Sequence, residues 1–221
     1  MQKLVIFGKG KIAKIVYHYL KNEYDVCAFA VNQKFIDAES MFGLPVIPFE
    51  HIEARFSPSR HKMLVAVGYQ DMNRFREKVY HDAKSKGYEL ISYVDTNAKR
   101  FDDVEIGENC IVLDHTTLQP YVKIGSNSVI WSNVTIAHGA IIGDNCWIAS
   151  GAVVAGDAVL QANCFVGINA SIGHNVNIGP ANYIGASAQI CKNTQPEDVY
   201  IAEQATKFRI GSGQFMRFAQ T

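Results

Sequence analysis

His138, Gly156 and His174 follow one another at intervals of eighteen residues and carry the chemistry that the sequence suggests. Histidine changes charge between about pH 5 and pH 8, so it can act as a general base on an attacking amine or hydroxyl. Glycine has no side chain to cover its backbone N–H, which can then donate to a developing oxyanion. If His138 and Gly156 are neighbours in space, they form a base and an oxyanion donor suited to acyl transfer.

A six-residue repeat predicts that they are neighbours. From Asp102 to Asn193 the fifth residue of every hexad is aliphatic, the third is mostly small, and turn formers crowd the sixth, first and second. The third and fifth residues share one side of a short strand, and the turn formers supply the bend. Three hexads close one triangular coil of a β-helix, so residues eighteen apart stack at roughly 4.8 Å.

The fifteen hexads predict about five coils, in a solenoid domain spanning 98–193 with a tail at 194–221. His138 opens its hexad and therefore lies at a corner, outside the aliphatic interior, with Gly156 one coil away. His174 lies two coils away, at roughly 10 Å, too far for direct contact within one chain. Cys110, Cys146 and Cys164 occupy third positions, which predicts buried free thiols in a reducing compartment.

Residues 1–97 predict a different, α/β domain. Buried-type strands are expected at 4–7, 24–31, 44–47, 63–67 and 88–94, and helices at 12–22 and 71–85. Alternating strands and helices favour a parallel sheet with helices on its faces. We therefore expect a partial Rossmann-like or flavodoxin-like domain followed by an all-β parallel β-helix.

The turn at Gly8 and Gly10 joins the first strand to the first helix, where backbone amides can hold a phosphate. Ala13 stands at the third position of the dinucleotide fingerprint, which accepts alanine. The second strand ends at Asn32 rather than at the carboxylate expected to bind a ribose. The pattern predicts a site for a nucleotide diphosphate rather than for NAD.

The fourth strand runs into Gly68 and Tyr69, on the side where open parallel sheets bind ligands. Gly68 allows a base or ribose to approach the backbone closely, and Tyr69 could stack on it.

Composition narrows the classes of partner. The 221 residues carry 21 basic and 21 acidic side chains, and this balance argues against nucleic acid or a membrane surface as the main partner. The N-terminus runs directly into a strand instead of a signal peptide, and no apolar run is long enough for a membrane span. We therefore expect a cytoplasmic protein.

Three stretches resemble the bacterial sugar acyltransferases of the hexapeptide-repeat family, namely the bacillosamine-pathway N-acetyltransferase and its sialic-acid O-acetyltransferase-like relatives. They read LVIFGKGKIAKIVY, MLVAVGYQDMNRFREKVY and SNVTIAHGAIIGDNCWIASGAVVAGDAVLQANCFVGINASIG. The resemblance covers nearly the whole chain. It implies a left-handed β-helix, a homotrimer with active sites between subunits, and acetyl-CoA as acyl donor with no metal.

The resemblance also implies roles for single residues. The catalytic base falls on His138 and the oxyanion donor on Gly156. The remaining implied positions are those of the acetyl-CoA groove, Ile168, Gly185 and Ala186, and those of the nucleotide-sugar site, Gly8, Gly10, Asn32, Gly68 and Tyr69. The expected activity is N-acetylation of a nucleotide-linked amino sugar for surface glycan, lipopolysaccharide or glycoprotein synthesis.

Two departures from the family bear on the acceptor. Gly139 stands where the bacillosamine-type enzymes place an acidic residue, so another group must orient the imidazole; Asn133, Asp114 or a group of a neighbouring chain are candidates. Trp147 replaces a polar residue, which predicts a more apolar acceptor pocket.

Two alternatives remain open beside N-acetylation, and a third is disfavoured. Sugar O-acetylation needs the same base, and a non-catalytic scaffold or binding protein could keep the fold without the activity. A zinc hydratase on the same solenoid needs two histidines five residues apart, and His115, His138 and His174 contain no such pair.

Overall fold

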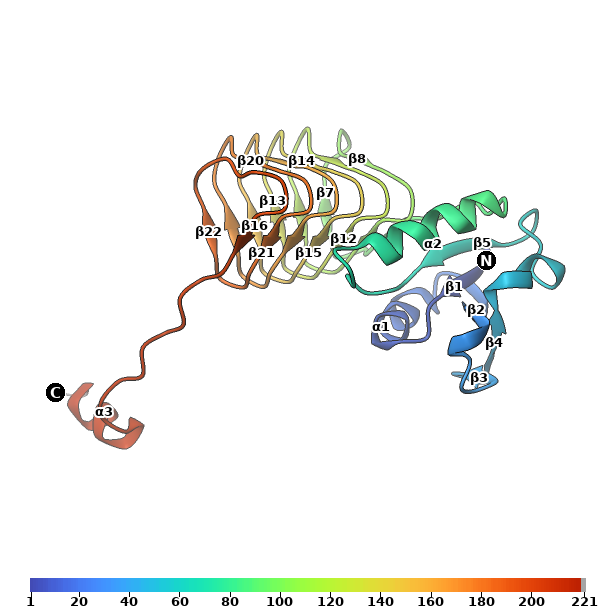
Figure 1. Cartoon of the computed structure of the whole chain (residues 1–221), viewed down its shortest axis with the longest axis horizontal. Helices are drawn as coiled ribbons and strands as arrows, with labels where there is room; N and C mark the ends of the chain where they lie inside the picture. Colours follow the sequence, from blue (N-terminus) through green and yellow to red (C-terminus); the bar gives the residue numbers. More distant parts are fainter. Residues whose placement is uncertain (220–221) are drawn as a thin grey trace.

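The computed structural model describes residues 1–219 as an α/β domain, a triangular solenoid and a C-terminal tail (Figure 1). The tail leaves the last coil and carries α3 (Ser212–Ala219) away from the rest of the molecule (Figure 1). None of the helices within these residues is long and apolar enough to cross a membrane.

The first domain holds a five-stranded sheet flanked by two helices. Its elements are β1 (Lys3–Phe7), α1 (Lys11–Leu20), β2 (Asp25–Val31), η1 (Gln33–Phe35), β3 (Ser40–Met41), β4 (Leu44–Pro48), η2 (Phe49–Ala54), β5 (Lys62–Val65) and α2 (Arg74–Ser85). The sheet order is β3-β4-β2-β1-β5, and every pair is parallel except β3 with β4. Counting only the parallel strands, this is the order 3-2-1-4 of a truncated Rossmann fold, which decides between the two expected topologies.

One expected strand is wrong. The stretch 88–94 was predicted as the fifth strand of the first domain, but only an isolated bridge joins Leu90 to Met63. Tyr93 and Val94 form β6 instead, and β6 pairs with the solenoid strand β9. The alternation of apolar residues is the same in both settings, so the sequence could not tell which sheet the strand joins.

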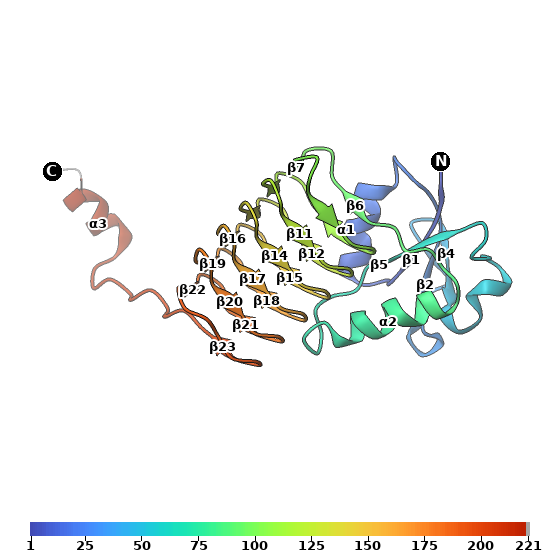
Figure 2. The ribbon, with the colours of Figure 1, turned by 90° about the horizontal axis from the view of Figure 1, so that it is seen from above.

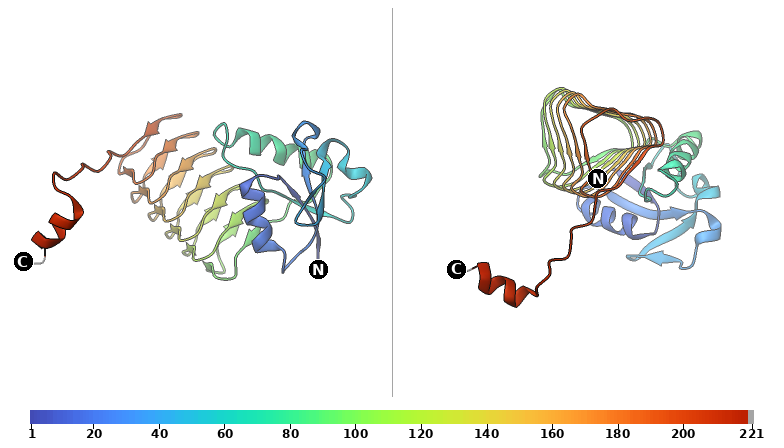
Figure 3. Two further views of the ribbon diagram at one scale, coloured as in Figure 1. Left: turned by 90° about the horizontal axis from the view of Figure 1, so that it is seen from below. Right: turned by 60° about the vertical axis from the view of Figure 1, so that its left-hand side comes forward.

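Three parallel sheets, called here sheets I, II and III, form the walls of the solenoid (Figures 1 and 3). Sheet I contains β7 (Lys99–Arg100), β10 (Thr117–Leu118), β13 (Thr135–Ile136), β16 (Val153–Val154), β19 (Ser171–Ile172) and β22 (Gln189–Ile190). Sheet II contains β8 (Glu105–Ile106), β11 (Lys123–Ile124), β14 (Ile141–Ile142), β17 (Val159–Leu160) and β20 (Asn177–Ile178). Sheet III contains β6 (Tyr93–Val94), β9 (Ile111–Val112), β12 (Val129–Ile130), β15 (Trp147–Ile148), β18 (Phe165–Val166), β21 (Tyr183–Ile184) and β23 (Val199–Tyr200).

The register confirms the eighteen-residue coil of the predicted left-handed β-helix. Thr117 pairs with Thr135, and Thr135 pairs with Val153. The second residue of each hexad from Asn109 to Ser187 is left-handed, with φ between 55° and 73°, which explains the abundance of Asn and Gly there. The aliphatic fifth residues and the small third residues fill the interior, and Cys110, Cys146 and Cys164 lie there fully buried as free thiols.

The first domain packs against sheet III. The outward-facing residues Ile111, Val129, Trp147 and Phe165 of that sheet are buried in one cluster with the α1-facing side of the Rossmann sheet. Burial of a large apolar side chain stabilises by about 1.5–3 kcal/mol, so this cluster fixes the two domains to each other. Figure 2 shows the α/β domain beside the first coils and the tail at the opposite end of the solenoid.

Polar contacts at the two edges of sheet III fix the domains further. The buried Arg76 guanidinium donates from Nε and Nη2 to the Asn127 carbonyl, at 3.0 and 2.6 Å, and from Nη1 to the Val65 carbonyl at 3.2 Å. Because burial disfavours the charged form, the pKa of Arg76 is lowered to about 10.

At the other edge, Asp114 accepts hydrogen bonds at one carboxylate oxygen from the Ser132 hydroxyl at 2.5 Å and from the Tyr19 hydroxyl at 2.6 Å. Hydrogen bonds from Ser132 and Tyr19 hold the pKa of Asp114 below its ordinary value.

Candidate active site

His138 lies on the edge where sheets I and II meet, between β13 and β14. Its backbone N–H donates to Oε1 of Gln119 at 3.0 Å, and its ring Nδ1 lies 3.3 Å from the same oxygen. The side chain is exposed. Gln119 is not among the residues expected at the site, although the coil length contains a signal: a residue nineteen positions before His138 lies beside it on the previous coil.

Gly156 lies directly against the imidazole. A Cβ added at Gly156 would stand 2.7 Å from Nε2, 2.8 Å from Cε1 and 3.2 Å from Cδ2 of His138. Only glycine leaves room for the ring in this position. Within the described residues, no hydrogen bond uses the Gly156 N–H, which therefore remains able to donate to a bound group.

The position of Asp157 is the reason why glycine is needed at position 139, directly after His138. Gly139 has φ +69°, and a Cβ there would stand 2.3 Å from Oδ1 of Asp157 on the next coil. The carboxylate of Asp157 thus fills the place where a side chain of residue 139 would begin. Asn133 and Asp114, the two residues suggested above as partners of the imidazole, lie on the edge between sheets III and I instead.

Ile168, Gly185 and Ala186 also lie on the edge between sheets III and I, so sheet I separates them from His138. The carbonyl of Ile168 accepts a 2.8 Å hydrogen bond from the N–H of Ser187, which stacks the two turns. Ile168 is 56% exposed, whereas Gly185 is buried. The three predicted acetyl-CoA residues therefore form a second group on the solenoid.

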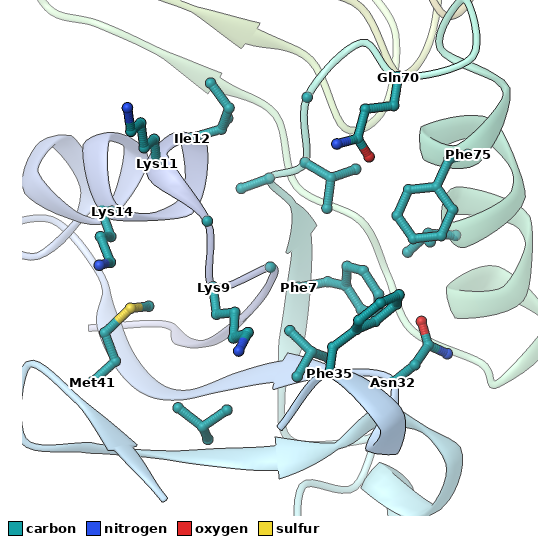
Figure 4. Close-up of a pocket in the computed structure, with 18 of the residues that line it drawn as sticks. Phe7, Lys9, Lys11, Ile12, Lys14, Asn32, Phe35, Met41, Gln70 and Phe75 are labelled. Atoms are coloured by element: carbon teal, nitrogen blue, oxygen red, sulfur yellow. The ribbon is translucent and has the colours of Figure 1, made fainter. Parts of the chain in front are cut away.

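A cavity of about 1000 Å³ opens at the carboxyl ends of β1, β2 and β5 in the first domain (Figure 4). Gly8, Gly10, Asn32 and Gly68, four of the five residues expected at the nucleotide-sugar site, line it. The cavity lies at the point where the strand order reverses, which is the ligand site of open α/β sheets. A Cβ at Gly8 would stand 2.5 Å from the Ala66 carbonyl oxygen, so glycine is required for the chain to pass there.

Basic and aromatic side chains both line this cavity. Lys9, Lys11 and Lys14 lie around the N-terminal part of α1 on one side, and Phe75 of α2 lies on the other (Figure 4). Lys9 pairs with Asp37, whereas the ion pairs found within residues 1–219 include no carboxylate partner for Lys11 or Lys14. The cavity therefore carries a positive excess suited to a polyanion.

Two aromatic residues lie where the sequence did not place them. Tyr69 is absent from the lining of the cavity; its ring lies 4.5 Å from that of Phe165 and 5.2 Å from that of Trp147. Trp147 is only 3% exposed in this interface. The expectation that Trp147 lines an acceptor pocket is therefore wrong, because the first domain covers it. Phe35, 48% exposed, and Phe75 are aromatic side chains of the cavity that no sequence motif marks.

No group of three or more His, Cys, Asp or Glu side chains within residues 1–219 is arranged to hold a metal ion. Cys146 and Cys164 are fully buried inside the solenoid, so neither thiol reaches the surface where His138 lies.

Residues 103–138 and 121–156 match the family described as bacterial transferase hexapeptide (six repeats). Residues 103–156 thus match a model of hexapeptide repeats. No curated protein sequence matches it.

Solved structures with the same two-domain fold are similar over nearly the whole chain. The acetyltransferase domain of PglB from Neisseria gonorrhoeae is 22% identical with a TM-score of 0.77, and the match covers 87% of this chain and 93% of that one. PerB from Caulobacter crescentus, in complex with CoA and GDP-perosamine, is 22% identical with a TM-score of 0.80 over 90% and 93% of the two chains. WeeI from Acinetobacter baumannii AYE is 21% identical with a TM-score of 0.80 over 90% and 96%. At these identities the similarity establishes a shared fold.

Proposed function

We propose that this protein transfers the acetyl group of acetyl-CoA to the amino group of a nucleotide-linked amino sugar. The observation that carries the proposal is the contact between the His138 imidazole and Gly156, where any side chain would displace the ring. A base beside an unused backbone N–H is the pair that amide formation from a thioester needs. PerB, which shares the fold, binds CoA and GDP-perosamine, a ligand pair of the proposed kind.

The reaction proceeds by direct transfer. The sugar amine attacks the thioester carbonyl, and His138 takes the proton that the amine loses. The Gly156 N–H donates to the oxyanion of the tetrahedral intermediate. Collapse of the intermediate breaks the C–S bond, and the proton passes from His138 to the departing CoA thiolate. The products are the N-acetylated sugar and CoA, and every step uses groups of the two substrates and this chain.

The nucleotide part of the acceptor binds in the Rossmann cavity. Lys11, Lys14 and the backbone amides at the start of α1 hold the diphosphate, because a helix N-terminus and ammonium groups both attract phosphate. Phe35 and Phe75 provide apolar faces for the base. The CoA lies along Ile168, Gly185 and Ala186.

The working enzyme is a homotrimer with its sites between subunits. The first domain covers sheet III, and His138 lies on the opposite edge, between sheets I and II. A sugar held in the cavity of one chain is therefore best placed for the His138 of a neighbour. A groove between two solenoids also joins the His138 edge of one chain to the Ile168 edge of the next.

A thiol-release assay with acetyl-CoA and a panel of nucleotide-linked amino sugars tests the activity. We expect turnover with one amino sugar and its loss in His138→Ala at unchanged thermal stability. Turnover that survives in His138→Ala refutes the assignment of the base. An acceptor that reacts only through a hydroxyl makes the protein an O-acetyltransferase, and no turnover with any acceptor refutes the proposal in favour of a binding protein.

Gly10 allows a test of the nucleotide site. A Cβ at Gly10 meets no atom within 4 Å, and the residue is the N-cap of α1. Gly10→Asp supplies a favourable helix cap but places a negative charge against the diphosphate, whereas Gly10→Ser supplies the cap alone. We expect Gly10→Asp to raise the KM for the sugar nucleotide at least tenfold and Gly10→Ser to leave it near the wild-type value. Equal KM values in the two variants contradict the placement of the diphosphate.

Mixing two impaired variants tests the arrangement between subunits. If His138 acts on the sugar held by a neighbour, co-refolded His138→Ala and Gly10→Asp chains turn over more substrate than equal amounts of the two variants assayed unmixed, at a sugar-nucleotide concentration below the wild-type KM. No such gain, or a monomer by analytical ultracentrifugation, contradicts the shared site.

A further inference from the structure

The contact between Gln119 and His138 fixes which atoms face each other. A backbone N–H can only donate, so the amide atom of Gln119 that lies 3.0 Å from the His138 nitrogen must be the carbonyl oxygen Oε1. The same oxygen lies 3.3 Å from ring Nδ1. A carbonyl oxygen can only accept, so Nδ1 must carry the ring proton.

This tautomer leaves the lone pair on Nε2. Nε2 is the ring atom that would stand nearest a Cβ at Gly156, at 2.7 Å. The free lone pair therefore lies on the ring atom nearest Gly156, the residue whose N–H we assign to the oxyanion. The backbone donor of His138 itself thus orients the glutamine, and the glutamine orients the ring.

Few titratable side chains lie near the His138 imidazole. Asp157 lies on the coil above, and His174 beyond it lies 4.0 Å from the Asp157 carboxylate. Below the ring, Asp102 and Asp103 precede Gln119 on the same edge, and Oδ2 of Asp103 accepts from the Tyr121 N–H at 3.1 Å. Within the described residues, no carboxylate accepts a hydrogen bond from the His138 ring.

We propose that Gln119 is the positioning residue of His138, a neutral acceptor that holds the base in its Nε2-reactive tautomer without a carboxylate partner. The proposal rests on the proposed function, since His138 is a base only if the protein transfers acyl groups. It assigns to Gln119, on the preceding coil, the orienting role for which Gly139 has no side chain. It also predicts that the pH dependence of the reaction can be moved by a single carboxylate at position 119.

Gln119→Glu and Gln119→Ala separate orientation from charge. Glutamate still accepts from both His138 donors but adds a negative charge beside the ring, which favours the protonated, inactive imidazolium. We expect the acid limb of kcat/KM to move to higher pH by about one unit in Gln119→Glu, with kcat retained on the alkaline side of that limb. In Gln119→Ala we expect kcat to fall roughly tenfold or more, with KM for acetyl-CoA near the wild-type value.

Gln161 is the matched control. It occupies the same sixth position of its hexad and is exposed, but it lies on the edge between sheets II and III, where Nε2 donates to Asn177 at 3.4 Å. Gln161→Glu and Gln161→Ala should leave both kcat and the pH profile unchanged. A shift of the same size in Gln161→Glu would mean that any added charge on the solenoid acts at long range, and it overturns the proposal.

Nitrogen-15 NMR of histidine-labelled protein tests the tautomer without any assay of turnover, with His138→Asn to assign the signal. A neutral ring protonated on Nδ1 in the wild type, and a mixture in Gln119→Ala, supports the proposal. A ring protonated on Nε2 in the wild type overturns it.

These results also distinguish the two proposals. Normal turnover and unchanged pH profiles in both Gln119 variants refute the positioning role alone. Absence of turnover in the wild type refutes the proposed function, and the NMR result still decides how Gln119 holds the ring.

Discussion

Gly156→Ala is the substitution whose effect the geometry defines best. The added methyl would stand 2.7 Å from Nε2 and 2.8 Å from Cε1 of His138. Ordinary contacts between such atoms begin near ~3.5 Å, so the ring must retreat by about 0.8 Å. The three nearest atoms all belong to the imidazole, at the far end of a rotatable and exposed side chain. The ring therefore moves, and the backbone of the coil stays in place.

The expected result is a loss of activity without a loss of stability. A displacement approaching 1 Å at a reacting group can reduce turnover by roughly 10²-fold. Stability should change by less than about 1 kcal/mol, because Ala in place of Gly restricts the unfolded chain and strains nothing in the fold. The Gly156 N–H is retained, so the variant tests the position of the base more than the oxyanion donor. The measurements are kcat by thiol release and the free energy of unfolding in urea.

Gly143→Ala is the matched control. A Cβ at Gly143 would stand 2.8 Å from the backbone nitrogen of Ala162 and from the backbone carbon of Gln161, neither of which can rotate away. We expect this variant to lose stability, by about 1–3 kcal/mol, with the turnover of the folded fraction largely kept. Wild-type kcat in Gly156→Ala would refute the reasoning, and so would an equal loss of stability in both variants.

Three further predictions concern stability. Gly139→Asp should lower the unfolding free energy by about 1–3 kcal/mol, because its Cβ would stand 2.3 Å from Oδ1 of Asp157, and adding Asp157→Gly should restore most of it; additive losses in the double variant contradict this. Arg76→Met should cost about 2–3 kcal/mol in urea unfolding, because two buried carbonyls lose their donors, and a cost below about 0.5 kcal/mol would show that the contact is dispensable. Asp114 has a lowered pKa, so its carboxylate stabilises the fold above the ordinary carboxyl pKa of 3.8, and this contribution is lost as the pH falls through the lowered value. Asp114→Asn should therefore be less stable than wild type by about 1 kcal/mol at pH 7 and equal to it in strong acid; a difference that persists there points to packing.

The hexad repeat alone was sufficient to predict the solenoid. A repeated hexad with an aliphatic fifth residue and turn formers at its ends buries its apolar residues by forming a triangular coil of three short strands. The coil length, the stacking of His138 on Gly156 and the inward-facing thiols therefore all followed from the spacing of the repeat. The Rossmann cavity was likewise predicted from Gly8, Gly10 and the strand that precedes them, because local backbone requirements place such glycines.

The contacts between side chains of different elements could not be predicted in the same way, because they depend on tertiary packing. The neighbours of Tyr69 and Trp147 depend on how the first domain lies against sheet III, and no local pattern encodes that packing. The side chain that contacts His138 also had to be found in the structure. Gln119 lies nineteen residues before His138, one position before the residue that stacks on it, and nothing in the sequence distinguishes it from an ordinary surface glutamine. Spacing along a repeat fixes the backbone, whereas hydrogen bonds between side chains on adjacent coils depend on rotamers, which only the assembled structure selects.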